Sequence, residues 1–261
     1  SSASPPLVEI RDVSVRFGRV EGLQGTTLDI HRREFLTLFG PSGCGKSTLL
    51  NIVAGLVKPY GGQTFFQGEL IQGINRSIGY MTQDDTLLPW RTLYKNVALP
   101  LELRKVRKRE IRSRVGDYLD LLDLAHAADR YPAQLSGGMK RRALLARSMI
   151  YEPEMLLMDE PFAAVDARLR EDLHEAVRAA VEQVHQTVMF VTHDVAEAAI
   201  LSDRVVVLGG RPASIVRTFE VPFGHNRDMA ALRLDDRLSQ IEREIRQSLG
   251  EATNEQEPTD V

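Results

Sequence analysis

Two short stretches of the 261-residue chain have residue types and spacing suited to binding phosphate. The first reads GPSGCGKST and spans residues 40–48, and the second reads LSGGM and spans residues 135–139. Each leads into a segment with helical pattern, and the free N–H groups and dipole at the start of a helix attract anions. Only the first stretch contains a phosphate-binding lysine, Lys46. The second stretch therefore requires a separate explanation.

The first stretch fits the P-loop pattern G-x-x-x-x-G-K-[ST] at every fixed position and lies between a predicted strand and a predicted helix. The pattern predicts that Lys46 contacts the β- and γ-phosphates of a nucleotide and that Ser47, with Thr48 beside it, places a hydroxyl on Mg²⁺. Cys44 fills a variable position, where a spacer role is favoured over a redox role. The remaining residues predicted to surround the phosphates are Gly40, Pro41, Ser42, Gly43 and Gly45.

Two carboxylates follow the hydrophobic segment MLLMDE at residues 155–160. We expect Asp159 to be a partner of Mg²⁺ and Glu160 to polarise the attacking water beside the γ-phosphate. Acidic residues can also simply end a strand, but the preceding P-loop favours the catalytic interpretation. His193 ends another predicted strand, where ligands bind in parallel sheets. The other histidines are interpreted as surface or structural: His31, His126, His174, His185 and His225.

Strand-like and helical segments alternate along the chain. Short β-rich segments occupy residues 7–17, 26–30 and 34–39, and helical patterns dominate residues 89–149. Buried apolar runs then alternate with helical segments as far as about residue 223, which is typical of a parallel sheet covered on both faces. The pattern predicts an α/β fold with a doubly wound core and a helical subdomain.

Composition narrows the class of protein. The hydrophobic fraction is 43%, the charged fraction is 26%, and the net charge of −3 disfavours nucleic acid as a partner. No apolar run reaches the length of about 18 residues that would span a membrane, and we expect no signal peptide. The single cysteine excludes an intrachain disulfide and suits a reducing compartment.

These motifs, in their order, resemble the ATP-binding subunit of an ATP-binding-cassette (ABC) transporter across about residues 7–223. In that family, LSGGM is the signature motif and residues 155–159 form the Walker B strand, followed by the catalytic Glu160. The resemblance makes Gln83 the Q-loop contact to Mg²⁺ and water, and it places Asp166 in the D-loop. It makes His193 the switch histidine that contacts the γ-phosphate. Phe17 stands where the family has an aromatic residue that stacks on adenine.

The same resemblance implies a P-loop NTPase (RecA-like) core with an N-terminal antiparallel β subdomain and an inserted α-helical subdomain. We expect a disordered N-terminus at 1–6 and an ATP-binding core at 7–88 and 150–223. Residues 89–149 would form the helical subdomain, and residues 224–261 a helical extension with a disordered acidic tail from residue 251.

Family resemblance also gives the second stretch a role. Two chains would pack as a head-to-tail homodimer, so that each ATP lies between the P-loop of one chain and the signature of the other. Ser136, Gly137 and Gly138 would then act on the partner's ATP, and a two-fold dimer would create two identical composite sites. One phosphate lysine per chain is sufficient in that arrangement.

Looser similarities in residues 88–103, 202–223 and 227–245 point to the nitrate, sulfonate and taurine importer branch. That branch implies two integral membrane permease subunits, an external solute-binding protein and a position on the cytoplasmic face of the inner membrane. The solute is not encoded in the chain. The alternatives are a soluble ABC ATPase that is not coupled to transport, and a P-loop kinase or GTPase, which would leave the LSGG helix start unexplained.

Two surface features can each be interpreted in two ways. Residues 102–116 hold seven Arg or Lys and two Glu, which could face acidic lipid headgroups or the membrane subunit. A solvated helix face is the alternative. Trp90 either lines the groove in which the family binds the membrane subunit or packs internally.

Overall fold

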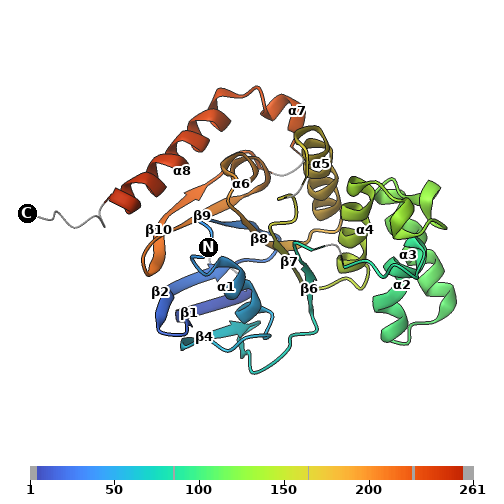
Figure 1. Cartoon of the computed structure of the whole chain (residues 1–261), viewed down its shortest axis with the longest axis horizontal. Helices are drawn as coiled ribbons and strands as arrows, with labels where there is room; N and C mark the ends of the chain where they lie inside the picture. The colour runs from blue at the N-terminus through green and yellow to red at the C-terminus, as the bar shows by residue number, and fades with distance from the viewer. Residues whose placement is uncertain (1–4, 85, 164, 225–226, 255–261) are drawn as a thin grey trace, which may run out of the picture. The chain divides into compact units, whose positions relative to one another are not determined.

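The computed structural model describes residues 5–84, 86–163, 165–224 and 227–254 (Figure 1). The chain splits into two compact units. Unit 1 comprises the described parts of residues 1–75 and 186–261, and unit 2 comprises those of residues 76–185.

Unit 1 is built on a mixed sheet with strand order β5-β4-β1-β2-β10-β9-β3-β8. Antiparallel pairs join β1 to β2 and β4, β4 to β5, and β9 to β10, whereas β3 lies parallel to both β8 and β9. The bounds are β1 Val8–Phe17, β2 Val20–Ile30, β3 Phe35–Phe39, β4 Gly61–Phe66, β5 Glu69–Leu70, β8 Thr187–Thr192, β9 Arg204–Gly210 and β10 Ala213–Glu220. All residues of β3 and β8 are buried, which explains their uninterrupted apolar sequence.

The helices of unit 1 cover this sheet. They are α1 Lys46–Val53, α6 Val195–Leu201, α7 Met229–Leu232 and α8 Asp236–Asn254. Helix α1 packs against β1, β4 and β8, and α6 packs against β3 and β8. Helix α8 runs along β9 and β10 and contacts α6, as Figure 1 shows in red and orange. The C-terminal extension therefore belongs to the core of unit 1.

Arg227 fixes the segment that leads into α7 and α8. Its guanidinium donates to the Ile200 carbonyl oxygen at 3.0 Å and to Asp203 Oδ1 at 2.8 Å, and its side chain is only 1% exposed. A buried guanidinium must keep such partners, because an unpaired buried charge is strongly unfavourable.

Unit 2 is mainly helical and contains one parallel strand pair. Strands β6 (Ile78–Met81) and β7 (Met155–Asp159) pair in register from Ile78–Met155 to Met81–Met158. The helices are α2 Leu93–Leu103, α3 Lys108–Leu121, α4 Gly137–Met149 and α5 Ala167–Gln183, with short 3-10 turns η1 Ala125–Ala127 and η2 Pro132–Gln134. Helices α2, α3 and α4 pack on one another (Figure 1, green).

The α/β class and the antiparallel subdomain are as expected, but two element limits differ. Strand β2 is longer than the expected segment at residues 26–30. The acidic tail was expected to be disordered from residue 251, and this is wrong for residues 251–254, which continue α8. Glu and Ala are good helix formers, and they extend a helix that packing already stabilises. The proposed domain limits stay predictions.

Across the described residues, no helix combines the length and the apolar character needed to cross a bilayer.

Candidate functional site

The loop between β3 and α1 has the backbone geometry of an anion-binding turn. Gly43 has φ of 79° and Gly45 has φ of 99°, a left-handed conformation that glycine adopts without steric cost. Gly45 is the N-cap of α1 and makes no side-chain cap hydrogen bond. The N–H groups at this helix start are therefore left for an external acceptor.

Gly40 is required for a different reason, which is close backbone approach. A Cβ atom at this position would lie 2.5 Å from the carbonyl oxygen of Leu208 in β9. No side chain can be accommodated at that distance unless β3 and β9 move apart.

The Lys46 side chain lies inside the loop and is 4% exposed. Its Nζ donates to the carbonyl oxygens of Gly40 at 2.8 Å and Pro41 at 2.7 Å, and it lies 3.9 Å from the Sγ of Cys44. No carboxylate of the described residues forms an ion pair with it. A buried ammonium held by neutral groups leaves a net positive charge, which favours an anionic ligand.

The other loop residues divide by exposure. The Cys44 thiol is buried within the turn, whereas Pro41, Ser42 and Ser47 are exposed. Thr48 is half-buried in the first turn of α1.

Strand pairing brings His193 to the same sheet edge as the P-loop. Phe39 at the end of β3 pairs with Thr192 at the end of β8, so Gly40 and His193 follow neighbouring strand ends. His193 is exposed there. The structure thus places two predicted site elements, far apart in sequence, at one edge of unit 1.

The turn that carries His193 is held by a buried carboxylate that sequence reasoning missed. Thr192 Oγ1 donates to Glu197 Oε2 at 2.5 Å, and the Asp194 N–H donates to Thr192 Oγ1 at 3.0 Å. Glu197 is 4% exposed. Asp194 caps α6 by accepting from the N–H of Ala196 at 2.8 Å. The spacing Asp-x-x-Glu matches a capping box, and this signal could have identified Asp194 as the N-cap but not the contact of Glu197 with Thr192.

Gln83, Asp159 and Glu160 lie at one edge of unit 2, because they follow the paired ends of β6 and β7. Glu160 has φ of 43°, which is uncommon for a residue with a side chain and is typical of functional positions. Burial, together with the negative charge of Asp159, raises the pKa of Tyr80 above its usual value. Tyr80 therefore stays protonated beside this carboxylate.

The signature and the D-loop both form helix starts in unit 2. Ser136 caps α4, and its Oγ accepts from the Met139 N–H at 3.3 Å. Asp166 caps α5, and its Oδ1 accepts from the Leu169 N–H at 3.1 Å. A Cβ on Gly138 would lie 2.4 Å from Leu169 Cδ1, so the two helix starts pack closely.

Some expected features have no side-chain description. Phe17 ends β1, but its side chain lies outside the described part of the structure. Its predicted contact with adenine stays a prediction. His225 lies outside the described residues altogether.

The donor set fits Mg²⁺ only together with phosphate oxygens. Within the described residues, no group of three or more His, Cys, Asp or Glu could hold a metal by itself. Mg²⁺ in nucleotide sites commonly takes one or two carboxylates plus phosphates and water. Asp159 in unit 2 and Ser47 in unit 1 each carry an oxygen donor of the kind that Mg²⁺ takes in such sites.

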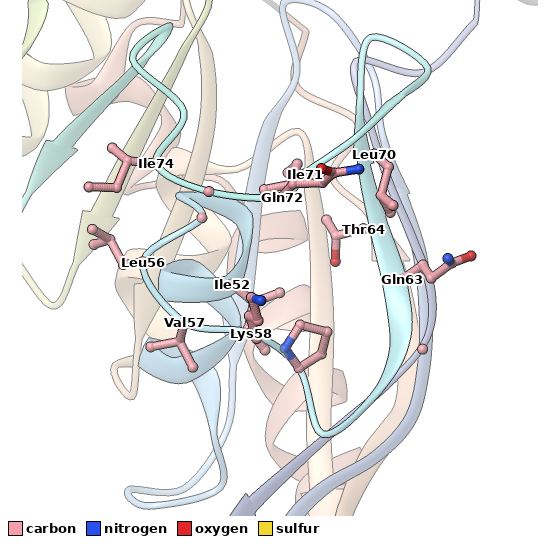
Figure 2. A pocket seen from close by; sticks show the side chains of 14 residues that line it. Ile52, Leu56, Val57, Lys58, Gln63, Thr64, Leu70, Ile71, Gln72 and Ile74 are labelled. Carbon is pink, nitrogen blue, oxygen red and sulfur yellow. The ribbon is translucent and has the colours of Figure 1, made fainter.

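Unit 1 also has a pocket of about 610 Å³ away from the P-loop (Figure 2). Figure 2 shows the chain that follows α1 on one side and β4 on the other. The apolar lining residues Leu56, Val57, Leu70 and Ile74 are exposed by 51%, 42%, 40% and 70%. Exposed apolar residues gathered at a pocket are typical of a protein contact.

Comparison with known proteins decides the family. Residues 23–163 match the family model described as ABC transporter. The chain belongs to the ABC transporter family. Family members hydrolyse ATP, and this ABC protein is accordingly an ATPase.

Relatives and solved structures of ABC proteins agree with this assignment. The sulfate/thiosulfate import ATP-binding protein CysA of Synechococcus elongatus is 40% identical over 83% of this chain and 66% of its own length. The bicarbonate transport ATP-binding protein CmpC of the same species is 45% identical over 74% of this chain and 29% of its own length. This chain thus spans less than two thirds of both relatives.

The structural comparison gives the same result. The dimeric structure of a post-hydrolysis state of the ATP-binding cassette MJ0796, bound to ADP and Pi, has a TM-score of 0.70 and 29% identity. The match covers 82% of this chain and 98% of that one.

Proposed function

We propose that this ABC ATPase drives import of a small anion through partner membrane subunits. The observation that supports the proposal is the presence of two helix starts suited to binding anions. One contains the buried Lys46, and the other is the start of α4, capped by Ser136. A motor subunit that shares each ATP between two chains needs both, whereas an ordinary P-loop kinase needs only the first.

In the proposed mechanism, the P-loop binds the triphosphate of ATP. The backbone N–H groups of residues 40–48 and the Lys46 ammonium surround the β- and γ-phosphates. Mg²⁺ supplies charge neutralisation at the phosphate oxygens when it is bound. Ser47, Asp159 and Gln83 are the proposed groups that hold it.

Hydrolysis needs a base and a group that senses the γ-phosphate. We assign the base to Glu160, whose carboxylate would orient and polarise the attacking water. His193 would contact the γ-phosphate, and Gln83 would contact the water. Residues 192–197 hold the His193 turn by the hydrogen bonds described above.

Two chains would complete each site. The exposed Ser136 and Gly137, with the buried Gly138, would present the start of α4 to the γ-phosphate bound by the partner chain. Asp166 at the neighbouring start of α5 would lie at the same interface. Such an interface is two-fold symmetric and creates two equal sites.

The membrane partner would bind apolar surface. Leu56, Val57 and Ile74 around the pocket of unit 1 are exposed, and so is Trp90 of unit 2, by 72%. The exposure of Trp90 favours a contact role over internal packing. We propose that two permease subunits cover these surfaces and hold the ATPase on the cytoplasmic face of the inner membrane. A solute-binding protein would act outside it.

The proposed solute is a small anion, with nitrate, a sulfonate or taurine as candidates. The relatives named for sulfate/thiosulfate and for bicarbonate support the anionic class and leave the individual solute open. The second candidate is a soluble ABC ATPase that is not coupled to transport.

Replacement of Glu160 tests the assigned chemistry. Glu160→Gln removes the base but keeps shape and hydrogen-bonding capacity, so ATP should bind with parental affinity while kcat falls about a hundredfold or more. Asp172→Gln, on the exposed surface of α5, is a matched control and should retain full turnover. Unchanged hydrolysis in Glu160→Gln would refute the assigned role.

Co-purification distinguishes import from a soluble role. The tagged chain is expressed in its native host, membranes are solubilised gently, and the proteins that co-purify are identified by mass spectrometry. A polytopic membrane protein in about equal amount supports import. Recovery of soluble proteins alone would refute it.

A further inference from the structure

Five cations gather at the start of α3 without an internal partner. They are Lys105, Arg107, Lys108, Arg109 and Arg112, here called the basic strip. All five residues are exposed; four of them lie within residues 105–109, and Arg112 follows three residues after Arg109. Within the described residues, none of the five side chains makes an ion pair or hydrogen bond.

The neighbouring carboxylates cannot neutralise the strip, because they already have partners. Glu102 accepts from Arg91 Nη1 at 2.6 Å. Glu110 accepts from Arg114 Nη2 at 2.7 Å, on the other flank of α3. The basic strip therefore presents an uncompensated positive charge to solvent.

This arrangement is unfavourable for the helix itself. Lys108, Arg109 and Arg112 place positive charge in the first turns of α3, where the helix dipole disfavours cations. Arg109 and Arg112 are three residues apart and repel each other. The N-cap Arg107 makes no side-chain cap hydrogen bond, so the first N–H groups of α3 also lack a side-chain acceptor. An external anion would offset each of these costs.

We propose that the basic strip binds the phosphate-bearing headgroups of an anionic membrane surface. Leu103, at the end of α2 and two residues before the strip, is 74% exposed and supplies an apolar group beside the cations. Surfaces that bind at the membrane interface typically combine cations with exposed apolar side chains. An acidic protein face would match the charge and leave Leu103 unexplained. The inference goes beyond the permease contact, because it places the ATPase against lipid directly.

Vesicle binding by the full chain tests the proposal. The partition coefficient is measured by co-sedimentation with phosphatidylcholine vesicles, with and without phosphatidylglycerol. The variant Arg107→Ala/Lys108→Ala/Arg109→Ala should lose about a hundredfold in partitioning to the anionic vesicles, as expected for removal of three cations near a charged surface. Added salt should weaken wild-type binding, because it screens the charges.

A control variant separates local charge from net charge. Arg130→Ala/Arg211→Ala/Arg246→Ala removes the same number of exposed cations elsewhere and should bind the anionic vesicles far better than the strip variant. Leu103→Ser should weaken vesicle binding less than the strip variant does. ATP hydrolysis should be unchanged in the strip variant, because none of its residues belongs to the proposed ATP site.

Three results would overturn the proposal. The first is equal binding of wild type to neutral and anionic vesicles, and the second is equal loss in the strip and control variants. The third is a strip variant that binds vesicles normally but no longer co-purifies with the permease, which would assign the strip to an acidic protein face. Recovery of soluble proteins alone with the wild-type chain, together with intact vesicle binding, would instead refute the proposed function and leave the lipid contact standing.

Discussion

At the scale of single residues, the turn carrying His193 depends on a side chain that touches no proposed substrate atom. Glu197 is buried, and its carboxylate accepts from the hydroxyl of Thr192, the residue before His193. The Thr192 hydroxyl oxygen in turn accepts from the N–H of Asp194, the residue after His193. His193 is thus held between two residues of one hydrogen-bonded network. Glu197 is a positioning residue in this account.

Two replacements of Glu197 should show whether its hydrogen bond to Thr192 positions the His193 turn for catalysis. Glu197→Gln keeps a carbonyl oxygen that can accept from Thr192 and should retain most of kcat. Glu197→Leu leaves the buried hydroxyl without its acceptor, which costs about 1–3 kcal/mol of stability, and it should lower kcat more than it raises KM. Steady-state kinetics of folded samples provide the measurement. Equal kcat in the two variants would show that the acceptor is irrelevant.

Gly40 gives a second prediction at this scale. Gly40→Ala puts a Cβ 2.5 Å from the Leu208 carbonyl oxygen, and we expect a loss of about 1–3 kcal/mol in unfolding free energy. Gly68, whose Cβ would meet nothing within 4 Å but whose φ is 78°, is the control for backbone strain alone. Urea denaturation of Gly40→Ala and Gly68→Ala compares the two. A smaller loss at Gly40 would contradict the close-approach argument.

The position of the proposed site residues at strand ends was predictable, because the P-loop, the carboxylates and the histidine all follow apolar segments in the sequence. Parallel pairing then places strand ends together, as found for Gly40 with His193 and for Gln83 with Glu160. The Thr192–Glu197 contact was not predicted, since a glutamate in a helix reads as solvent-exposed until packing is known. The contact of Gly40 with β9 was also unpredictable, because it depends on a strand pairing between distant segments.

At the scale of elements, α8 extends the core beyond the region that the family motifs cover. It packs on β9, β10 and α6, and α6 begins directly after the His193 turn. Burial raises the pKa of Glu242 on α8, Arg246 opposes this rise, and the charge of Asp194 adds to it. The raised pKa shows that the Glu242 carboxylate is held in an environment that disfavours its charge.

The pH dependence of stability follows from this shift. A carboxyl with a folded-state pKa above its unfolded value binds protons more strongly in the folded state. The contribution of such a carboxyl to the stability of the fold is therefore present at low pH and is lost as the pH rises through the folded-state pKa. Glu242→Gln should raise Tm relative to wild type at pH 7, and the gain should disappear below about pH 4, where both states are protonated. Thermal melts across this range measure it, and a gain that persists at low pH would contradict the assignment.

The extent of α8 shows where sequence reasoning is limited. A helical extension was expected from residue 224 up to the acidic tail, and α7 and α8 are found there. The buried ion pair of Arg227 with Asp203 was not foreseen, because neither residue lies in a pattern that signals burial. Helix ends are set by packing and fraying, which explains the error at residues 251–254.

At the scale of the whole molecule, the central claim is that two chains share each ATP. Lys46 and Ser136 lie at the two helix starts that we propose bind phosphate, and the two starts differ in chemistry. Lys46 supplies a buried charge within a glycine loop, whereas Ser136 supplies a capped helix start with exposed neighbours. A dimer should therefore be active at one site when Lys46 is intact in one chain and Ser136 is intact in the other.

Mixing two inactive variants tests this claim most directly. Lys46→Ala should lose its own phosphate site, and Ser136→Arg should block the site of its partner. In a mixed head-to-tail dimer, the P-loop of the Ser136→Arg chain faces the intact signature of the Lys46→Ala chain. Random pairing in equal amounts should then restore up to about a quarter of wild-type ATP hydrolysis, since half of the dimers carry one intact site of two. Mixtures no more active than either variant alone would contradict the shared site.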